Sequence, residues 1–474
     1  MRLESFEEWF AVRPNHSDEA DHLPARLTFD LDEGIYLDTI RFSGSRENQD
    51  GFRVSGQTLT GWLDYQRPAT LIQPWVQRTR RLSIGMDTPV MRESRRFVAN
   101  ALLRNVFLED ISAPIFTGLA VENPAFHAWV NPCLVNPDWS RPEDAGLPSL
   151  SVDVQPPQQR TFTLADGTQA KVTSATRVPS GEATTLEEYT LLELQFPKPV
   201  NFDAVTRVAG RVSALFEFLI GARVQAPIYY LPTTHKRLWN GEEHEVVAEY
   251  WYQPIPRKKR RDAPPEVFRR LTFEKRSPVP LEALLNHVSG SSDELIFLAD
   301  QIQSAEDYDL SITQGYGEIL GCLEDFDRRT FGSGADENFE QDMKRLNALI
   351  EKHGSRADIT LFRRISGTAS NGYSLLKRLE RLHKIWNEDG FRGNPDLKRI
   401  RELRNLLPHG RGLEVSSDVL QEMVIHLHYL AALGRYHVLK VLGFTGDQIR
   451  AAFLSQAHRY GTFIPDTPRR QPSA

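Results

Sequence analysis

Cysteine is scarce in this sequence of 474 residues, which contains only Cys133 and Cys322. The two lie far apart in the chain, so neither a disulfide framework nor a thiolate cage around a metal ion can be built within it. We expect both cysteines to be inert packing residues.

Long apolar runs are absent as well. No segment approaches the roughly 18 uninterrupted apolar residues that cross a bilayer. The first residues, MRLESFEEWF, carry acidic side chains where a signal peptide needs a positive lead and an apolar block. We therefore expect a cytoplasmic protein without a membrane partner.

Several motifs of catalysis and cofactor binding are also missing. The sequence has no Walker loop and no serine elbow, and Gly315, Gly317 and Gly321 have neither the dinucleotide spacing nor a preceding strand. His426 and His428 are two apart on an expected helix, so they diverge by about 200° and cannot share a metal ion on one face. We assign both to packing or to the surface, and we expect no cofactor.

Excess positive charge is lacking overall, since the formal net charge is −6. This argues against a surface that coats nucleic acid generally, but it leaves local patches open. One such patch is RKKRR at 257–261, which is most simply a solvated loop. The other is the segment from Asp396 to Arg411, in which five cations face two acidic residues.

The first 200 residues have the pattern of short strands and turns. Segments such as GIYLDTIRF, SLSVDVQP and YTLLELQF mix β-branched and aromatic residues in near alternation between Gly, Pro, Asp and Asn turns. This predicts a twisted antiparallel sheet or a sandwich. The stretch 201–220 interrupts the pattern, because apolar residues recur there at three- and four-residue steps after an Asn cap and predict a helix.

The pattern changes between Pro254 and Pro280, where six prolines and the cationic run indicate an exposed connector. From Leu281 onward the apolar period is 3.6, and short loops between the helices predict an all-α bundle of about 180 residues. Helices are predicted around 295–302 and at 312–331, 339–350, 373–386, 396–407 and from Ser416 or Ser417 onward. The fold class is therefore α+β multidomain: a β-rich N-terminal domain over 1–280, an all-α helical bundle over 281–460, and a disordered tail over 461–474.

The stretch RNLLPHG, from Arg404 to Gly410, is the candidate site. In a straight helix, side chains five residues apart point about 140° away from one another. Pro408 disfavours helical geometry at Leu407 and ends or kinks the helix, so His409 can turn back towards Arg404. Gly410 suits the left-handed cap that would close this turn.

The spacing of Arg and His alone carries little information, because Arg378 and His383 share it. These two lie inside an uninterrupted leucine-striped helix, where we expect them to be solvated residues of one face. Asn405, which follows Arg404 directly, distinguishes the later stretch.

These residue types suit metal-independent cleavage of RNA. A histidine titrates near neutrality and can take the proton from a 2′-OH or protonate the leaving 5′ oxygen, while an arginine clamps the phosphate. An asparagine can hydrogen-bond a phosphate oxygen or orient the histidine. A single histidine supplies half of the acid and base work, which favours a symmetric homodimer or a higher even oligomer. The candidate catalytic residues are Arg404, Asn405 and His409, and the candidate RNA contacts are Lys398, Arg399, Arg401 and Arg411.

A late all-α domain carrying R-N-x-x-x-H in LRNLLPHG resembles the HEPN superfamily of metal-independent ribonucleases. The β-rich N-terminal half in front of it resembles the ApeA-like anti-phage defence proteins of bacteria. The resemblance implies a dimeric RNA endonuclease, with tRNA as one candidate substrate, that leaves a 2′,3′-cyclic phosphate and acts as the toxic effector of abortive infection. It implies that the N-terminal domain senses a phage-derived trigger, and that an acidic residue of an early helix, Glu324 or Asp325, joins the site.

Two alternatives remain open. In the first, the helical domain is a non-catalytic dimerisation or docking module, and the β-rich domain binds a ligand or a phage protein. In the second, the front half is a metal-dependent nuclease that uses Glu188 and Glu193 on a strand-like run, although no convincing Asp and Lys companions are present.

Overall fold

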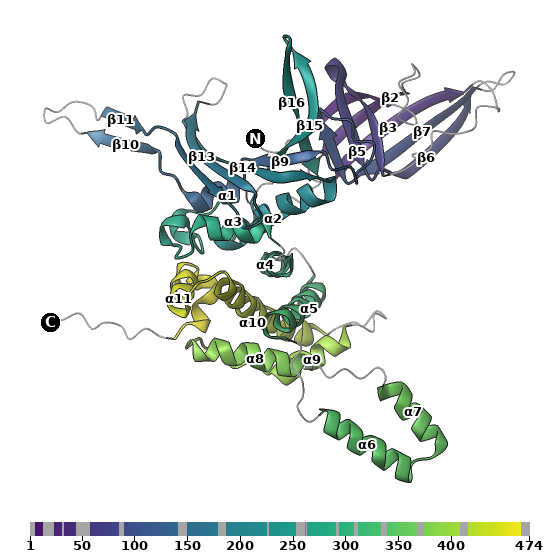
Figure 1. Cartoon of the computed structure of the whole chain (residues 1–474), viewed down its shortest axis with the longest axis vertical. Helices are drawn as coiled ribbons and strands as arrows, with labels where there is room; N and C mark the ends of the chain where they lie inside the picture. The colour runs from purple at the N-terminus through teal and green to yellow at the C-terminus, as the bar shows by residue number, and fades with distance from the viewer. Residues whose placement is uncertain are drawn as a thin grey trace. The chain divides into compact units, whose positions relative to one another are not determined.

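The computed structural model divides the chain into two compact units, Met1–Ser291 and Ser292–Ala474. The described residues are 5–12, 23–30, 33–43, 57–84, 90–140, 149–178, 186–224, 227–252, 261, 263–290, 293–307, 311–332, 339–366, 374–407 and 416–465. The first unit is rich in strands and the second is helical, which confirms the predicted α+β class (Figure 1).

The strands of the first unit form one large antiparallel sheet. The 14 strands have the order β12-β13-β14-β9-β15-β16-β8-β5-β4-β1-β2-β3-β7-β6, and a separate hairpin pairs β10 with β11. The bounds are β1 (Phe6–Val12), β2 (Leu23–Asp30), β3 (Gly34–Ser43), β4 (Thr58–Leu63), β5 (Arg67–Ile72), β6 (Trp75–Ile84), β7 (Val90–Ala99), β8 (Ala101–Arg104), β9 (Phe116–Val121), β10 (Val135–Ser140), β11 (Ser149–Val154), β12 (Gln158–Thr163), β13 (Gln169–Arg177), β14 (Glu187–Val200), β15 (Tyr229–Trp239) and β16 (Glu242–Tyr252). The predicted antiparallel sheet is therefore confirmed as a single long sheet.

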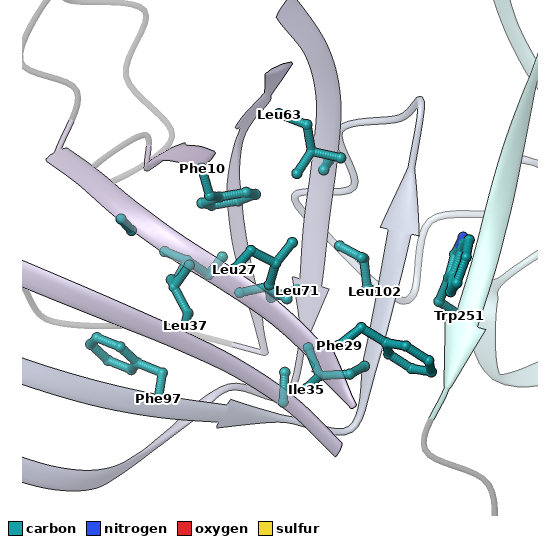
Figure 2. Packing of buried hydrophobic residues seen from close by; sticks show 14 of the residues in the cluster. Phe10, Leu27, Phe29, Ile35, Leu37, Leu63, Leu71, Phe97, Leu102 and Trp251 are labelled. Atoms are coloured by element: carbon teal, nitrogen blue, oxygen red, sulfur yellow. The ribbon is translucent and has the colours of Figure 1, made fainter. Parts of the chain in front are cut away.

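Alternation along the strands fills a core on one face of this sheet. On β3, Ile35 and Leu37 are buried in the core, whereas Tyr36 and Asp38 at the alternate positions point to the opposite face, because strand side chains alternate. Figure 2 shows Leu37 and Phe97 among the side chains of this core. The ring of Phe29 packs edge-on against Trp251, with ring centroids 5.3 Å apart, which joins β2 to β16. Burying each such side chain contributes about 1.5–3 kcal/mol.

Three helices accompany the sheet: α1 (Pro124–Val130), α2 (Phe202–Ile220) and α3 (Leu281–Ser289). The predicted Asn cap of α2 is confirmed, since Asn201 Oδ1 accepts a hydrogen bond from the backbone N–H of Ala204 at 3.0 Å. The helix packs against α1 and β9 (Figure 1). It ends at Gly221, whose φ of 71° lies in the left-handed region that glycine adopts without strain.

Helix α3 belongs to the first unit, so the division between the units falls beyond residue 280. The buried Arg211 of α2 accounts for this, because its Nη1 donates to the carbonyl oxygens of Val288 and Gly290 at the carboxyl end of α3. A cation at that end also complements the helix dipole.

The second unit consists of α4 (Asp293–Glu306), α5 (Ile312–Phe331), α6 (Phe339–His353), α7 (Arg356–Ser366), α8 (Leu375–Glu388), α9 (Leu397–Leu406), α10 (Ser417–Val441), α11 (Gly446–Ser455) and α12 (Ala457–Tyr460). Helix α10 packs against α4, α5 and α8, while α6 and α7 pack against each other. The six predicted helices are present as α4, α5, α6, α8, α9 and α10, and Ser416 is the cap of α10. Helices α7, α11 and α12 were not predicted.

Buried ion pairs hold the second unit together. The fully buried carboxylate of Asp327 on α5 accepts hydrogen bonds from Arg378 at 3.1 Å and from Arg381 Nε at 2.8 Å, both on α8. The fully buried Arg435 of α10 donates to Gln303 Oε1 at 2.9 Å and to Glu306 on α4. Removing one partner of such a pair leaves an uncompensated charge in the interior, so these pairs fix the packing of the helices.

The two cysteines differ from each other in burial. Cys322 is buried, as expected, and burial raises the pKa of its thiol to about 12. Cys133 is exposed, so the packing expectation is wrong for it. It follows α1 with a φ of 52°, in the left-handed region of backbone conformation.

Candidate functional site

Helix α9 positions the candidate residues. It begins where Asp396 Oδ1 accepts the backbone N–H of Arg399 at 3.0 Å, and Ile400 and Leu403 bury its inner face. It ends at Leu406, as Pro408 led us to expect. Leu407, however, keeps helical angles (φ −72°, ψ −42°), and its N–H donates to Arg404 O at 3.1 Å, so the expectation of a non-helical Leu407 is wrong. This 3₁₀-type bond tightens the last turn.

Arg404 lies on the last turn of α9 and faces α5. Its Nη2 donates to Glu324 Oε2 at 3.3 Å, and the two side chains are 37% and 30% exposed. Glu324 is therefore the acidic residue of α5 that contacts the candidate arginine. Asp325, the other candidate, pairs with Arg328 on its own helix. A pair this exposed contributes about 0–1 kcal/mol, so it orients Arg404 more than it stabilises the fold.

Asn405 is exposed beside Arg404. Its side chain has no hydrogen-bond partner among the residues that the structure describes. The amide can therefore turn towards a ligand at the end of α9 without giving up an internal bond.

His409 lies outside the described residues, together with Pro408, Gly410 and Arg411. The turn that would bring its imidazole towards Arg404 stays a prediction.

The candidate RNA contacts on α9 have different environments. Arg399 donates to both carboxylate oxygens of Glu422 on α10, at 2.9 and 3.0 Å, and lies 3.5 Å from Glu402. The hydrogen bonds from Arg399 lower the pKa of the Glu422 carboxyl. Lys398 is exposed and Arg401 half-buried, and neither has an ion-pair partner within the described part of the chain. The sequence analysis did not identify Glu422 as the partner of Arg399. Its position one turn before His426 on α10 could have drawn attention to it.

His426 and His428 of α10 lie apart, as their spacing predicts. His426 is half-buried, with its ring centroid 6.5 Å from that of Tyr316, and burial lowers its pKa. His428 is exposed, 5.2 Å from the ring of Phe463. In the described ranges, no group of three or more His, Cys, Asp or Glu side chains is arranged to hold a metal ion.

Arg378 and His383 on α8, which share the Arg–His spacing, are less exposed than expected, since Arg378 is buried and His383 is half-buried. Arg378 is buried and bound to Asp327 on α5. His383 lies 2.7 Å from the hydroxyl of Tyr429 on α10, and burial lowers its pKa. The two side chains differ from Arg404 because α8 packs against both α5 and α10, which leucine periodicity alone does not reveal. They contact different helices and form no common site.

The acidic pair of the front half is also separated. Glu188 Oε1 accepts the N–H of Val135 at 2.6 Å, and Glu193 lies 2.6 Å from Lys171 Nζ. The two glutamates are five positions apart on β14 and so occupy opposite faces of the sheet. This arrangement gives no support to a metal-dependent nuclease there.

Only the last residue of the RKKRR run lies in the described part of the chain. The N–H of Arg261 donates to Arg223 O at 3.1 Å, next to an isolated bridge with Val224. The rest of the run lies outside the described residues.

The family model for ApeA N-terminal domain 1 matches residues 8–273, more than half of the chain. The chain belongs to the ApeA N-terminal domain 1 family. It is an ApeA-like anti-phage defence protein. The match ends before α3 and so does not include the α9 site. Searches of curated proteins and of solved structures returned no match. Among the helices in the described ranges, none combines the length and apolar character needed to cross a bilayer.

Proposed function

We propose that this ApeA-like protein is a metal-independent RNA endonuclease of the HEPN type, with tRNA as one candidate substrate, and the toxic effector of abortive infection. Its catalytic groups are Arg404, Asn405 and His409 of both subunits of a homodimer. The observation that carries the proposal is the placement of Arg404 and Asn405 on the final turn of α9, with one side chain held by Glu324 and the other unbonded among the described residues.

The proposed reaction is an in-line transfer at phosphorus. The 2′ oxygen attacks the phosphorus while the imidazole of His409 takes the 2′ proton. The bond from phosphorus to the 5′ oxygen breaks, and the imidazolium of the second subunit's His409 protonates that oxygen. The products are a 2′,3′-cyclic phosphate and a 5′ hydroxyl. Arg404 compensates the charge that develops on the phosphate, and Asn405 hydrogen-bonds one of its oxygens.

Glu324 acts through Arg404 in this proposal and is a positioning residue. It directs the guanidinium and partly neutralises it until a phosphate binds. Because the pair is partly exposed, a phosphate can share the guanidinium at small cost. We expect Glu324→Gln to lower the rate of RNA cleavage by less than about tenfold, with a change in kcat larger than that in KM.

The test uses the purified full-length protein with total RNA and with tRNA. We expect Arg404→Ala and His409→Ala to abolish both cleavage and toxicity in cells. Arg345→Ala on α6 and His428→Ala on α10, which replace exposed residues of the same types, should retain both. Cleavage should persist in EDTA, because Arg, Asn and His do not form a set of ligands for hard divalent cations. A His409→Ala protein as toxic as the wild type would refute the proposal.

A second candidate function is a non-catalytic dimerisation or docking module. The Arg404–Glu324 ion pair favours it, because the pair reduces the positive charge offered to a phosphate. Under this alternative, the wild-type protein would leave RNA intact, and Arg404→Ala would change the oligomeric mass without changing any RNA end.

A further inference from the structure

An arginine-lined hollow lies on the first unit, far along the sequence from the α9 site. Its volume is about 580 Å³, within the range of small-molecule sites. It is formed by β3, β7 and β6, which are neighbours at one end of the sheet order (Figure 1). We name it the arginine hollow; its lining is Asp38, Thr39, Gln77, Arg78, Arg80, Ser94, Arg95 and Arg96.

Strand register explains why charges gather there. Arg78 on β6 is directly opposite Arg96 on β7, and Arg96 is directly opposite Asp38 on β3, so these three side chains share one face. The next pair on that face is Arg80 with Ser94. It is the face opposite the core, because Leu37 and Phe97, at the alternate positions of the same strands, point into the core (Figure 2).

Among the residues that the structure describes, a carboxylate of the hollow pairs with Arg96. Asp38 binds Arg96 with two hydrogen bonds of 2.8 Å. The side chains of Arg78 and Arg80 are exposed, and neither guanidinium forms a hydrogen bond or an ion pair with the side chain of another described residue. Like charges directly opposite on neighbouring strands destabilise a sheet, so the Arg78–Arg96 pair carries a cost that a bound anion would remove.

Two aromatic residues adjoin the cations. Trp75 is opposite Val98, which is opposite Tyr36, so the row next to Arg78, Arg96 and Asp38 carries an aromatic residue at each end. The Trp75 side chain is 47% exposed. The guanidinium carbon of Arg96 lies 5.2 Å from the centre of the Tyr36 ring. An exposed aromatic ring beside a cationic row, such as Trp75, is a usual surface for a base and its phosphate.

We propose that the arginine hollow binds a nucleotide, with phosphates on Arg78 and Arg80 and the base stacked on Trp75. The planar guanidinium forms paired hydrogen bonds with phosphate oxygens, which suits it better than a lysine to this role. An acidic peptide would engage the arginines but would leave Trp75 without a ring to stack on. The nucleotide has two sources, a free nucleotide or a single strand of nucleic acid. The inference goes beyond the ribonuclease function, since it concerns the unit without Arg404.

The test measures binding of a short fluorescent single-stranded DNA to the full-length protein by anisotropy. DNA has no 2′-OH and survives the chemistry proposed for Arg404, so the result is independent of RNA cleavage. We expect Arg78→Glu/Arg80→Glu to weaken binding at least tenfold. In a plot of log affinity against log salt concentration, the slope of this variant should be shallower than that of the wild type by about 1.4, or about 0.7 for each lost phosphate contact. Trp75→Ala should weaken binding about fivefold or more, with the slope unchanged.

The control is Arg207→Glu/Arg237→Glu, which makes the same charge change at two exposed arginines of the same unit and should retain affinity within about twofold. Competition by ATP would identify a free nucleotide as the source, and competition by unlabelled DNA alone would identify a strand. Equal binding by wild type and Arg78→Glu/Arg80→Glu would overturn the proposal. The proposal would also be overturned if an oligoglutamate peptide displaced the labelled DNA completely and bound the Trp75→Ala variant as tightly as the wild type. Unchanged thermal unfolding of each variant excludes loss of the fold as the cause.

Discussion

Replacing Asp327 by Ala should destabilise the helical unit far more than replacing its near neighbour Asp325. The Asp327 carboxylate is fully buried, and its partner Arg378 is 5% exposed, so the variant leaves a guanidinium charge in the interior. Breaking such a pair costs about 3–5 kcal/mol. Asp325 and Arg328 are each about half exposed, and loss of that pair costs about 0–1 kcal/mol. The two substitutions thus compare a buried with an exposed carboxylate on one helix.

For a unit of this size, about 3–5 kcal/mol corresponds to a fall in melting temperature of about 6–20 °C. Differential scanning calorimetry of the full-length protein would measure it, and amide hydrogen exchange in α5 and α8 would locate the loss. The double variant Asp327→Leu/Arg378→Met should regain part of the stability, because apolar residues of similar volume remove the two most buried charges together. The partly exposed Arg381 still loses its carboxylate partner in this variant. A melting temperature for Asp327→Ala within about 2 °C of that for Asp325→Ala would refute the reasoning.

Three further outcomes are expected. The pKa of His437, lowered to about 4 by burial, is below its unfolded value, so stability is fully present above pH 6.5 and is lost as pH falls towards 4. Urea unfolding should show that the free energy of unfolding falls by on the order of 3 kcal/mol over this pH range. The fall should be smaller in His437→Gln. Gly118→Ala should destabilise the sheet by about 2 kcal/mol or more in thermal unfolding, because a Cβ would overlap the carbonyl oxygen of Leu194 on the neighbouring strand. Gly210→Ala, in an open position of α2, should instead stabilise by about 0.5–1 kcal/mol in the same assay.

Local patterns predicted much of the fold. Asn201 and Ser416 mark helix starts because a side-chain oxygen before an apolar stripe satisfies the first free N–H groups. The order of the 14 strands was not predictable, since it depends on pairings between segments distant in sequence. Helix α7 was missed because its apolar stripe is short and lies among charged residues.

The candidate site was predictable only in part. Sequence spacing identified Arg404 and Asn405, but it could not choose Glu324 over Asp325, because adjacent positions on a helix differ by about 100° and the choice depends on where α9 packs. The arginine hollow escaped notice for a related reason. Arg78 and Arg96 become neighbours through the register of β6 and β7, and a bulge between Val76 and Arg78 sets which face Arg78 takes.

The place of β6 in the sheet gives Arg78 and Arg80 a second effect. As the last strand in the order, β6 leaves the hydrogen-bonding groups of its outer edge unmatched by any strand in the described part of the chain. A strand of another copy could add there and start edge-to-edge aggregation. Two exposed arginines on β6 place like charges on any copy that approaches in this way, so they oppose edge-to-edge pairing of two copies through this strand.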